Sequence, residues 1–120
     1  MDRLGWTAFE EKEPEESDCL EGYLLIFHVF RCVVAEPWEA RHATPMYTHW
    51  KPIPRKGWIA AAERKPTKED SDVMHCVLAR SETQGFRVTG WHQLELQPHY
   101  THWMPTPEPP EKVREYRMRF

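Results

Sequence analysis

Two short motifs that occur twice constrain the fold more than any other feature of the sequence. Gly-Trp-Thr-Ala at residues 5–8 returns at 57–60 as Gly-Trp-Ile-Ala, 52 residues later. Tyr-Thr-His-Trp at 47–50 returns at 100–103, 53 residues later. One inserted residue in a loop accounts for the change of offset, because loops tolerate insertions well. Repetition at such a period predicts two copies of one small module.

The motifs also set the expected domain boundaries. They predict a first, divergent copy over residues 1–56, a second copy over 57–110 and a basic C-terminal tail over 111–120. A unit of about 50 residues buries too little surface to be comfortably stable alone. Only Arg55 and Lys56 join the end of the first closing motif to the start of the second copy, which is too short for a flexible tether. We therefore expect the two modules to pack together.

Within each copy, runs of β-branched and aromatic residues predict short strands. In the first copy these runs are residues 23–30 and 31–35, and in the second copy they are 73–78 and 86–91. Gln-Gly at 84–85 predicts a hairpin turn. Each Tyr-Thr-His-Trp motif forms a closing strand that ends at Pro-x-Pro, because proline has no N–H for the ladder. The expected fold is mainly β, with two short antiparallel β-meander modules from an internal duplication.

The composition limits the classes of protein to which the chain can belong. Its 6 Trp, 5 Phe and 4 Tyr predict a core built largely from aromatic rings. A net charge of −3 disfavours bulk nucleic-acid binding. No apolar run approaches the ~18 residues of a membrane span, and residues 1–6 lack the basic opening of a secretory signal. The expected location is therefore cytoplasmic, with no membrane partner.

Two charged segments stand apart from the predicted strands. Residues 10–21 carry seven carboxylates against Lys12 and are expected to form a solvated loop. Residues 109–120 begin with two prolines and end in basic residues, which fits a short C-terminal helix better than a strand. Opposite charge at the two ends leaves open a contact between chain ends or between protomers of a homo-oligomer.

The second copy also carries a family resemblance. It runs from Gly-Trp-Ile to the ending Thr-His-Trp-Met-Pro-Thr-Pro-Glu-Pro-Pro at 101–110, and over that length it resembles the domain of unknown function 551 family, which is found largely in phage and prophage genes. The first copy resembles a divergent member, because Lys51 replaces the methionine and Arg55-Lys56 replace the Glu-Pro-Pro ending. The resemblance implies a small β-rich phage or prophage accessory protein in the host-cell cytoplasm, and it implies no activity.

The residues that usually carry catalysis or bind metal do not form a recognisable set. His99 and His102 are three residues apart, so on one strand their side chains point to opposite faces of the sheet. Adding His92 to this pair does not complete a recognisable set of metal ligands. His75 and Cys76 are adjacent and also point to opposite faces, which disfavours a thiolate pair. We therefore expect no metal, no cofactor and no enzymatic activity.

The repeated aromatic side chains are the better candidates for a binding site. A chain of this size cannot easily bury six indoles completely, although most of them are expected to form the core. The expected ligand-binding or partner-binding residues are the repeated aromatic and imidazole side chains Trp38, Trp91, Tyr47, Tyr100, His49, His102, Trp50 and Trp103. The imidazoles of this set have an alternative structural role, hydrogen bonding beside packed indoles.

Three functions fit these observations, and the first is preferred. In the preferred function, the chain binds a host protein, for example a defence or regulatory component, through an aromatic and charged surface. Alternatively, an aromatic cradle sequesters a nucleotide-like small molecule. A third interpretation is a small hydrolytic or metal-dependent enzyme that uses His49 or His102.

Overall fold

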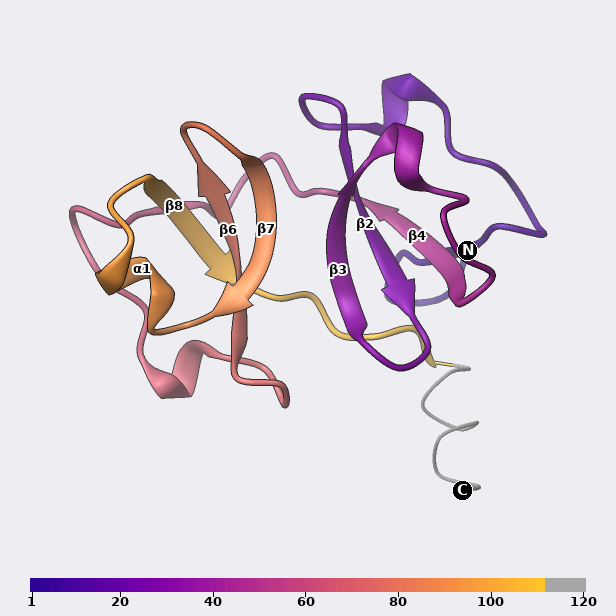
Figure 1. Cartoon of the computed structure of the whole chain (residues 1–120). Helices are drawn as coiled ribbons and strands as arrows, with labels where there is room; N and C mark the ends of the chain where they lie inside the picture. Colours follow the sequence, from indigo (N-terminus) through magenta and orange to yellow (C-terminus); the bar gives the residue numbers. More distant parts are fainter. Residues whose placement is uncertain (112–120) are drawn as a thin grey trace. The chain divides into compact units, whose positions relative to one another are not determined.

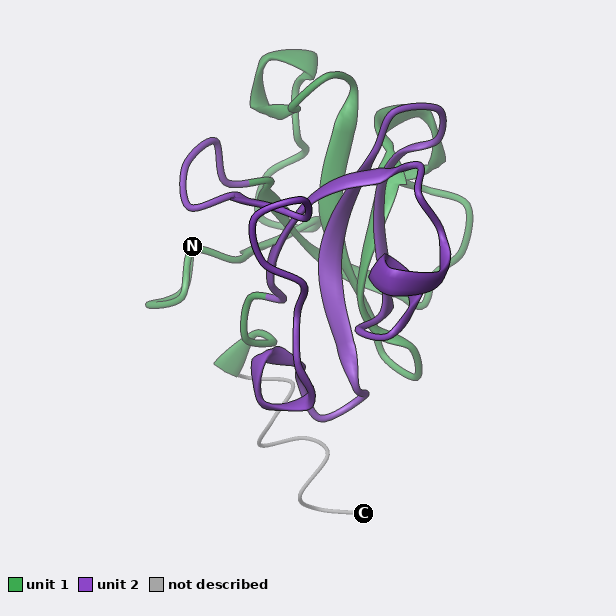
Figure 2. Ribbon diagram, turned by 90° about the vertical axis from the view of Figure 1, so that its left-hand side faces the viewer, with its two compact units in different colours: residues 1–53, 107–120 green, residues 54–106 purple. Residues whose placement is uncertain are grey.

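The computed structural model of the chain describes residues 1–111, which form two compact units (Figures 1 and 2). Unit 1 contains Met1–Ile53 and the segment that begins at Pro107, and unit 2 contains Pro54–Thr106. The expected C-terminal helix falls on residues that lie outside the described part of the chain. Segment 107–111 therefore follows unit 2 in the sequence but belongs to unit 1 in space.

Unit 1 is built on a four-stranded antiparallel sheet with the order β1-β4-β2-β3 (Figure 1). Its strands are β1 (Thr7–Ala8), β2 (Tyr23–His28), β3 (Cys32–Pro37) and β4 (Tyr47–Pro52), and two short 3-10 helices, η1 (Glu16–Asp18) and η2 (Trp38–Ala40), lie in the connections. The closing strand β4 thus lies between β1 and β2, while β2 and β3 form a hairpin.

Unit 2 repeats this arrangement with the strand order β5-β8-β6-β7. Its elements are β5 (Ile59–Ala60), η3 (Lys68–Asp70), β6 (Cys76–Ser81), β7 (Gly85–Gly90), the short helix α1 (Gln93–Leu96) and β8 (Tyr100–Pro105). The mainly β fold with two antiparallel modules is confirmed. Within the described chain, no helix combines the length and the apolar character that crossing a membrane requires.

The register of the two sheets is also the same. Trp50 lies opposite Ile26 on one side and β1 on the other, and Trp103 lies opposite Ala79 and β5 in the same way. Each sheet has a register shift near the end of its central strand, between Phe27 and His28 in unit 1 and at the matching place in unit 2. Each closing tryptophan therefore occupies the middle of its sheet.

The strand predicted over 73–78 is wrong in position, since the observed strand β6 is Cys76–Ser81. The Asp72 carboxylate accepts the backbone N–H of Cys76 at 2.9 Å and closes a turn before the strand. His75 completes that turn with a φ of 61°. An aspartate that hydrogen-bonds to the following backbone thus overrides the apolar run, and the strand starts only after the turn.

The other predicted strands lie close to their observed positions. Strand β2 ends two residues before residue 30, because residues 29–31 form the hairpin turn. The turn predicted at Gln84-Gly85 is present, and Gly85 has a φ of 76°, which suits glycine because it has no Cβ. In unit 1 the matching turn places Cys32 at a φ of 65°.

Each closing tryptophan joins a loop to the sheet. The Trp50 indole N–H donates to the Lys12 carbonyl at 2.8 Å, and the Trp103 indole N–H donates to the Arg64 carbonyl at 2.8 Å. Their exposed fractions are 4% and 0%. Truncating such a buried aromatic ring typically costs about 3–5 kcal/mol. These two indoles are therefore main contributors to the core of each unit.

The two cores fill the space around the indole differently. Phe9 packs against the core cluster of unit 1, whereas the matching position of unit 2 holds the smaller Ala61. Leu94 of α1 is 1% exposed and belongs to the same cluster as Ala61. The position that matches Leu94 in unit 1 is Arg41, whose guanidinium stacks 3.7 Å from the centre of the Trp38 ring. Leu94 therefore supplies apolar volume that Phe9 supplies in unit 1.

One turn position has a left-handed backbone in both units. Gly22 has a φ of 83°, and its carbonyl accepts the backbone N–H of Trp38 at 2.8 Å. His75 has a φ of 61°, and its carbonyl accepts the backbone N–H of Trp91 at 3.1 Å. A side chain in this conformation brings Cβ close to the following carbonyl, which costs about 1–2 kcal/mol. At this position unit 2 carries a strain that Gly22 avoids in unit 1, where the left-handed non-glycine residue of the turn is the preceding Glu21, with a φ of 50°.

We predict that Gly22→Ala lowers the free energy of unfolding by about 1 kcal/mol. A Cβ at Gly22 meets no atom within 4 Å, so the loss comes from the backbone conformation and not from a clash. The matched variant His75→Gly should not lose stability, because it relieves the same strain on an exposed residue. Urea unfolding followed by tryptophan fluorescence measures both. Equal stability of Gly22→Ala and the parent chain would contradict this account.

Candidate functional site

Three of the eight residues expected to bind a ligand or partner are core residues. Trp50, Trp103 and Tyr100 are 4%, 0% and 4% exposed. The indole N–H groups of the two tryptophans are already bonded to loop carbonyls. Their rings stabilise the two units and do not present a stacking surface.

The two repeated histidines have the same local partner. His49 Nδ1 lies 2.9 Å from the Thr48 hydroxyl, and His102 Nδ1 lies 3.0 Å from the Thr101 hydroxyl. Both imidazoles are half-buried. This repeated contact suits an orienting hydrogen bond within the closing strand.

Trp38 and Trp91 are half-buried at the matching positions after β3 and β7. The Trp38 indole N–H donates to the Pro14 carbonyl at 3.3 Å, and the Arg41 guanidinium covers one face of the ring. Trp91 packs against the core cluster of unit 2, and its ring meets the edge of His92 at a centroid distance of 5.8 Å. Both indoles thus help to close their own units.

Tyr47 lies beside an exposed surface at the end of the β2–β3 hairpin. Its ring meets the His28 imidazole edge-on at 5.6 Å, and the imidazole lies 6.3 Å from the Phe30 ring. Phe30 is 74% exposed and Met46 is 38% exposed. The backbone N–H of Val29 donates to the Met46 carbonyl at 3.1 Å, which ties the turn to the start of β4. We call His28, Phe30, Met46 and Tyr47 the turn patch.

His28 holds the turn patch in shape. Its Nδ1 accepts the backbone N–H groups of Phe30 and Arg31, each at 3.1 Å. Accepting these bonds requires a neutral ring with the proton on Nε2. Burial lowers the pKa of His28, and the nearby Arg31 guanidinium lowers it further. This role of His28 was not predicted from the sequence, because the apolar run from residue 23 to 30 predicts one strand that continues through His28.

The matching turn of unit 2 uses a hydroxyl for the same purpose. Ser81 Oγ accepts the backbone N–H groups of Thr83 and Gln84 at 3.1 and 3.0 Å. It also lies 2.8 Å from His99 Nδ1, and His99 Nε2 lies 2.7 Å from Gln97 Oε1. A serine, a histidine and an amide in a row are the parts of a nucleophile with its base. However, Ser81 is 6% exposed and its oxygen is engaged by two amides, so it acts as a turn cap.

The outer residues of the two turns differ in character. Thr83 and His99 of unit 2 stand where unit 1 has Phe30 and Met46. The same hairpin therefore forms with polar side chains at these positions. Its apolar surface in unit 1 is therefore not a requirement of the fold.

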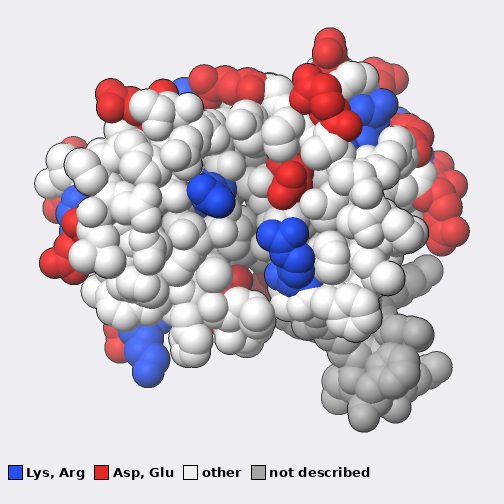
Figure 3. Space-filling model, in the orientation of Figure 1, with Lys and Arg blue, Asp and Glu red and all other residues white. Residues whose placement is uncertain are grey.

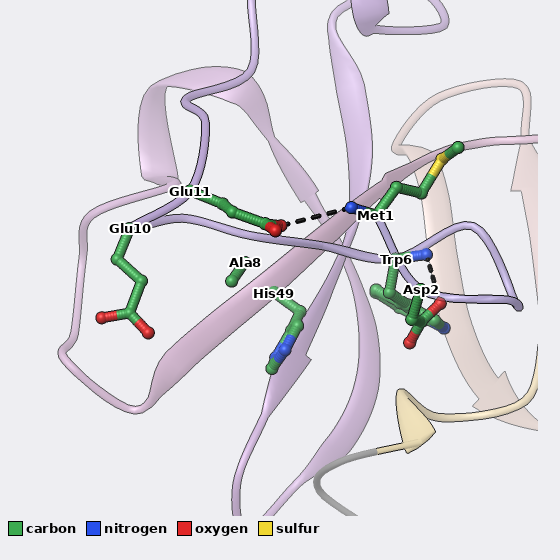
Figure 4. A pocket seen from close by; sticks show the side chains of 7 residues that line it. All are labelled: Met1, Asp2, Trp6, Ala8, Glu10, Glu11 and His49. Atoms are coloured by element: carbon green, nitrogen blue, oxygen red, sulfur yellow. Dashed lines mark hydrogen bonds and ion pairs between the residues drawn. The ribbon is translucent and has the colours of Figure 1, made fainter.

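Unit 1 also contains a cavity of about 290 Å³ near its first strand (Figure 4). It is lined by Met1, Asp2, Trp6, Ala8, Glu10, Glu11 and His49. The Asp2 carboxylate accepts the backbone N–H of Trp6 at 2.9 Å, and Glu11 lies 3.3 Å from the terminal amino group. Figure 4 shows His49 between the two glutamates on one side and Asp2 with Trp6 on the other. Carboxylates in the lining repel phosphate, which disfavours a nucleotide there.

Acidic side chains extend beyond this cavity. Figure 3 shows them gathered over the part of unit 1 that contains η1, which belongs to the acidic segment 10–21. Across residues 1–111, no three His, Cys, Asp or Glu side chains are grouped so that they could hold a metal ion. The surface chemistry near η1 is therefore that of a solvated acidic loop.

Comparison with known proteins found no family model, no curated protein and no solved structure that matches this chain. The resemblance of residues 57–110 to the domain of unknown function 551 family stays a prediction.

We predict that His28 makes the stability of the chain depend on pH. Because the pKa of His28 is lowered in the folded chain, its imidazole binds more protons in the unfolded chain as the pH falls below the ordinary imidazole pKa of about 6.5. The contribution of His28 to stability is complete above that value. It is lost as the pH falls through the folded pKa, because a protonated Nδ1 cannot accept the two amide bonds.

His28→Ser is the matched control, since unit 2 caps the same turn with Ser81. Between pH 7 and pH 5 the parent chain should lose more unfolding free energy than His28→Ser, as measured by urea unfolding at each pH. Parallel pH profiles of the two proteins would contradict the capping role.

Proposed function

We propose that the chain is a non-enzymatic binding protein whose turn patch contacts a partner protein. The observation that carries the proposal is the exposure of Phe30 on the hairpin turn and of Met46 beside it, where unit 2 has Thr83 and His99. Aromatic and methionine side chains are enriched at protein interfaces. An exposed phenylalanine on a rigid base is the kind of anchor that dominates binding energy.

The base of the turn patch supports this role. His28 fixes the backbone beneath Phe30, and Tyr47 packs against both His28 and the core cluster of unit 1. Binding therefore costs little ordering of the contact residues. Preorganisation of this kind favours affinity without a large contact area.

Charged groups surround the apolar centre. Burial raises the pKa of the Tyr47 hydroxyl, the Glu36 carboxylate raises it further, and the Arg31 guanidinium opposes both effects. Glu36 and Arg31 thus lie close enough to act on the patch. Rim charges of both signs favour a partner with a complementary pattern and speed association.

The resemblance of the second copy to a phage and prophage family favours a host protein as the partner. In this proposal the chain is a phage accessory protein, and a host defence or regulatory component is its target. The shared strand order and register of the two sheets support an origin by duplication of one module. The two copies then differ at this turn, which carries Phe30 and Met46 in the first copy and Thr83 and His99 in the second.

The other two interpretations have less support. An anionic nucleotide meets carboxylates in the cavity that contains Trp6, and Trp50 and Trp103 are buried. In the enzyme interpretation the active residue is His49 or His102, and each of these bonds the hydroxyl of the preceding threonine. The serine–histidine pair noted above caps a turn through Ser81. Protein binding uses the exposed residues that the fold does not itself require.

The test replaces the two apolar anchors with the residues of unit 2, as Phe30→Thr with Met46→His. Affinity capture from host lysate is compared between this variant and the parent chain. The expected result is a protein that the parent chain recovers and the double variant does not. Titration of that purified protein should show at least a roughly tenfold loss of affinity, as expected for a central anchor.

Val73→Thr is the matched control, because Val73 is 85% exposed but lies in unit 2, outside the turn patch. It should bind the partner as tightly as the parent chain does. Unfolding curves of all variants check that the hairpin still forms. Equal recovery of the same proteins by the parent chain and the double variant would refute the turn patch as the contact surface.

A further inference from the structure

Segment 107–111 is bound to unit 1 through the opening tryptophan. The Trp6 indole N–H donates to the Glu108 carbonyl at 2.7 Å. Trp6 is 1% exposed, and Pro110 is among the side chains that are less than 2% exposed. Residues 107–110 belong to no helix or strand. An extended proline-rich segment therefore sits on an indole, with one of its carbonyls bonded to the ring nitrogen.

Two polar contacts at Glu111 accompany this bond. The Glu111 backbone N–H donates to Asp2 Oδ2 at 3.3 Å, and the Arg3 guanidinium lies 2.6 Å from the Glu111 carboxylate. The Arg3 side chain is 84% exposed, so this ion pair contributes little. The buried ring of Pro110 and the indole bond carry most of the recognition.

Unit 2 repeats the same contact with its own opening tryptophan. The Trp58 indole N–H donates to the Pro54 carbonyl at 2.8 Å, at the end of a Pro-Ile-Pro sequence. In both units a phenylalanine ring meets this indole, Phe27 at 6.4 Å from Trp6 and Phe86 at 5.6 Å from Trp58. The opening indole of unit 2 thus also bonds a carbonyl of a proline-containing segment, although that carbonyl lies only four residues before it in the chain.

The chemistry of such a contact suits one class of ligand. Proline has no backbone N–H, so a proline-rich segment cannot continue a sheet ladder. Its extended form makes no internal hydrogen bonds, and its carbonyls stay open to donors. The indole offers a single N–H donor beside an apolar face. Recognition of proline-rich segments by aromatic surfaces uses these two properties.

We propose that the Trp6 site of unit 1 is a recognition site for extended proline-rich segments. In this structure residues 107–111 of the same chain act as a tethered ligand. A proline-rich segment of another polypeptide binds there when the tethered one leaves. This site is separate from the turn patch, so the proposal does not depend on the function proposed above.

The covalent link between segment 107–111 and the rest of the chain makes this segment a strong competitor of any free peptide. A linked segment competes at an effective concentration in the millimolar range. A free peptide therefore has to be offered to a full-length chain in which the tethered segment binds less well. Pro109→Gly with Pro110→Gly removes the buried ring and loosens the backbone, and we call this protein the strap variant. The probe is a synthetic peptide with the sequence of residues 104–111.

Binding is measured by calorimetry and by the NMR signal of the Trp6 indole N–H. The peptide should bind the strap variant and shift this signal, whereas the parent chain should respond far more weakly. Trp6→Phe in the strap variant keeps a ring but removes the donor, and it should weaken peptide binding roughly fivefold. Trp58→Phe is the matched control and should leave peptide affinity unchanged.

Two further peptides define the ligand. A peptide with alanine at every proline should not bind. An unrelated peptide with the same proline spacing should bind if the natural ligand is a foreign protein. Binding of the native peptide alone assigns the site to the same segment of a second copy.

The outcome that overturns the proposal is no binding at several millimolar peptide to a folded strap variant. Equal effects of Trp6→Phe and Trp58→Phe would also overturn it. If the strap variant does not fold, Pro110→Ala alone truncates the buried ring and leaves the other residues of the segment in place, and this variant is used in the same titrations.

Discussion

The hydrogen bond from each closing tryptophan to a loop carbonyl is the contact around which each unit is organised. Trp50 reaches the Lys12 carbonyl and Trp103 reaches the Arg64 carbonyl, and in both cases the loop follows the first short strand of the sheet. A strand of two residues cannot hold its own place in a sheet. The hydrogen bond of the indole compensates for the few hydrogen bonds of this short strand. It fixes the following loop against the core, and it satisfies the buried indole N–H.

The two units show which parts of the module can vary once this contact is made. Phe9 fills part of the core of unit 1, and Leu94 fills the corresponding volume in unit 2. A hairpin turn is capped by an imidazole at His28 and by a hydroxyl at Ser81, with the same two backbone donors in each case. Variation of this kind keeps the strand order of the two sheets the same and alters which side chains lie at the surface. The apolar turn of unit 1 is one product of that freedom.

Much of the fold follows from the repeated motifs, whereas the roles of single side chains do not. Two antiparallel modules and most strands are readable from β-branched and aromatic runs. The start of β6 is not, because it depends on the Asp72 carboxylate bonding to a backbone N–H. The burial of Trp50 and the exposure of Phe30 are equally unreadable. Each depends on groups that are distant in the sequence or on a cap that no apolar pattern records.

The placement of segment 107–111 in unit 1 has a consequence for how the chain is made. Unit 2 is continuous in sequence, so all of its residues are synthesised before the last part of unit 1. Unit 1 contains the N-terminus, yet the contacts of Trp6 are complete only when Glu108 has been synthesised, because the Trp6 indole N–H donates to the Glu108 carbonyl. The four strands of unit 1 are synthesised first, as is usual for an N-terminal unit, but the contacts of Trp6 are completed only after unit 2 has been synthesised. The first residues to be synthesised belong to the last unit to be finished.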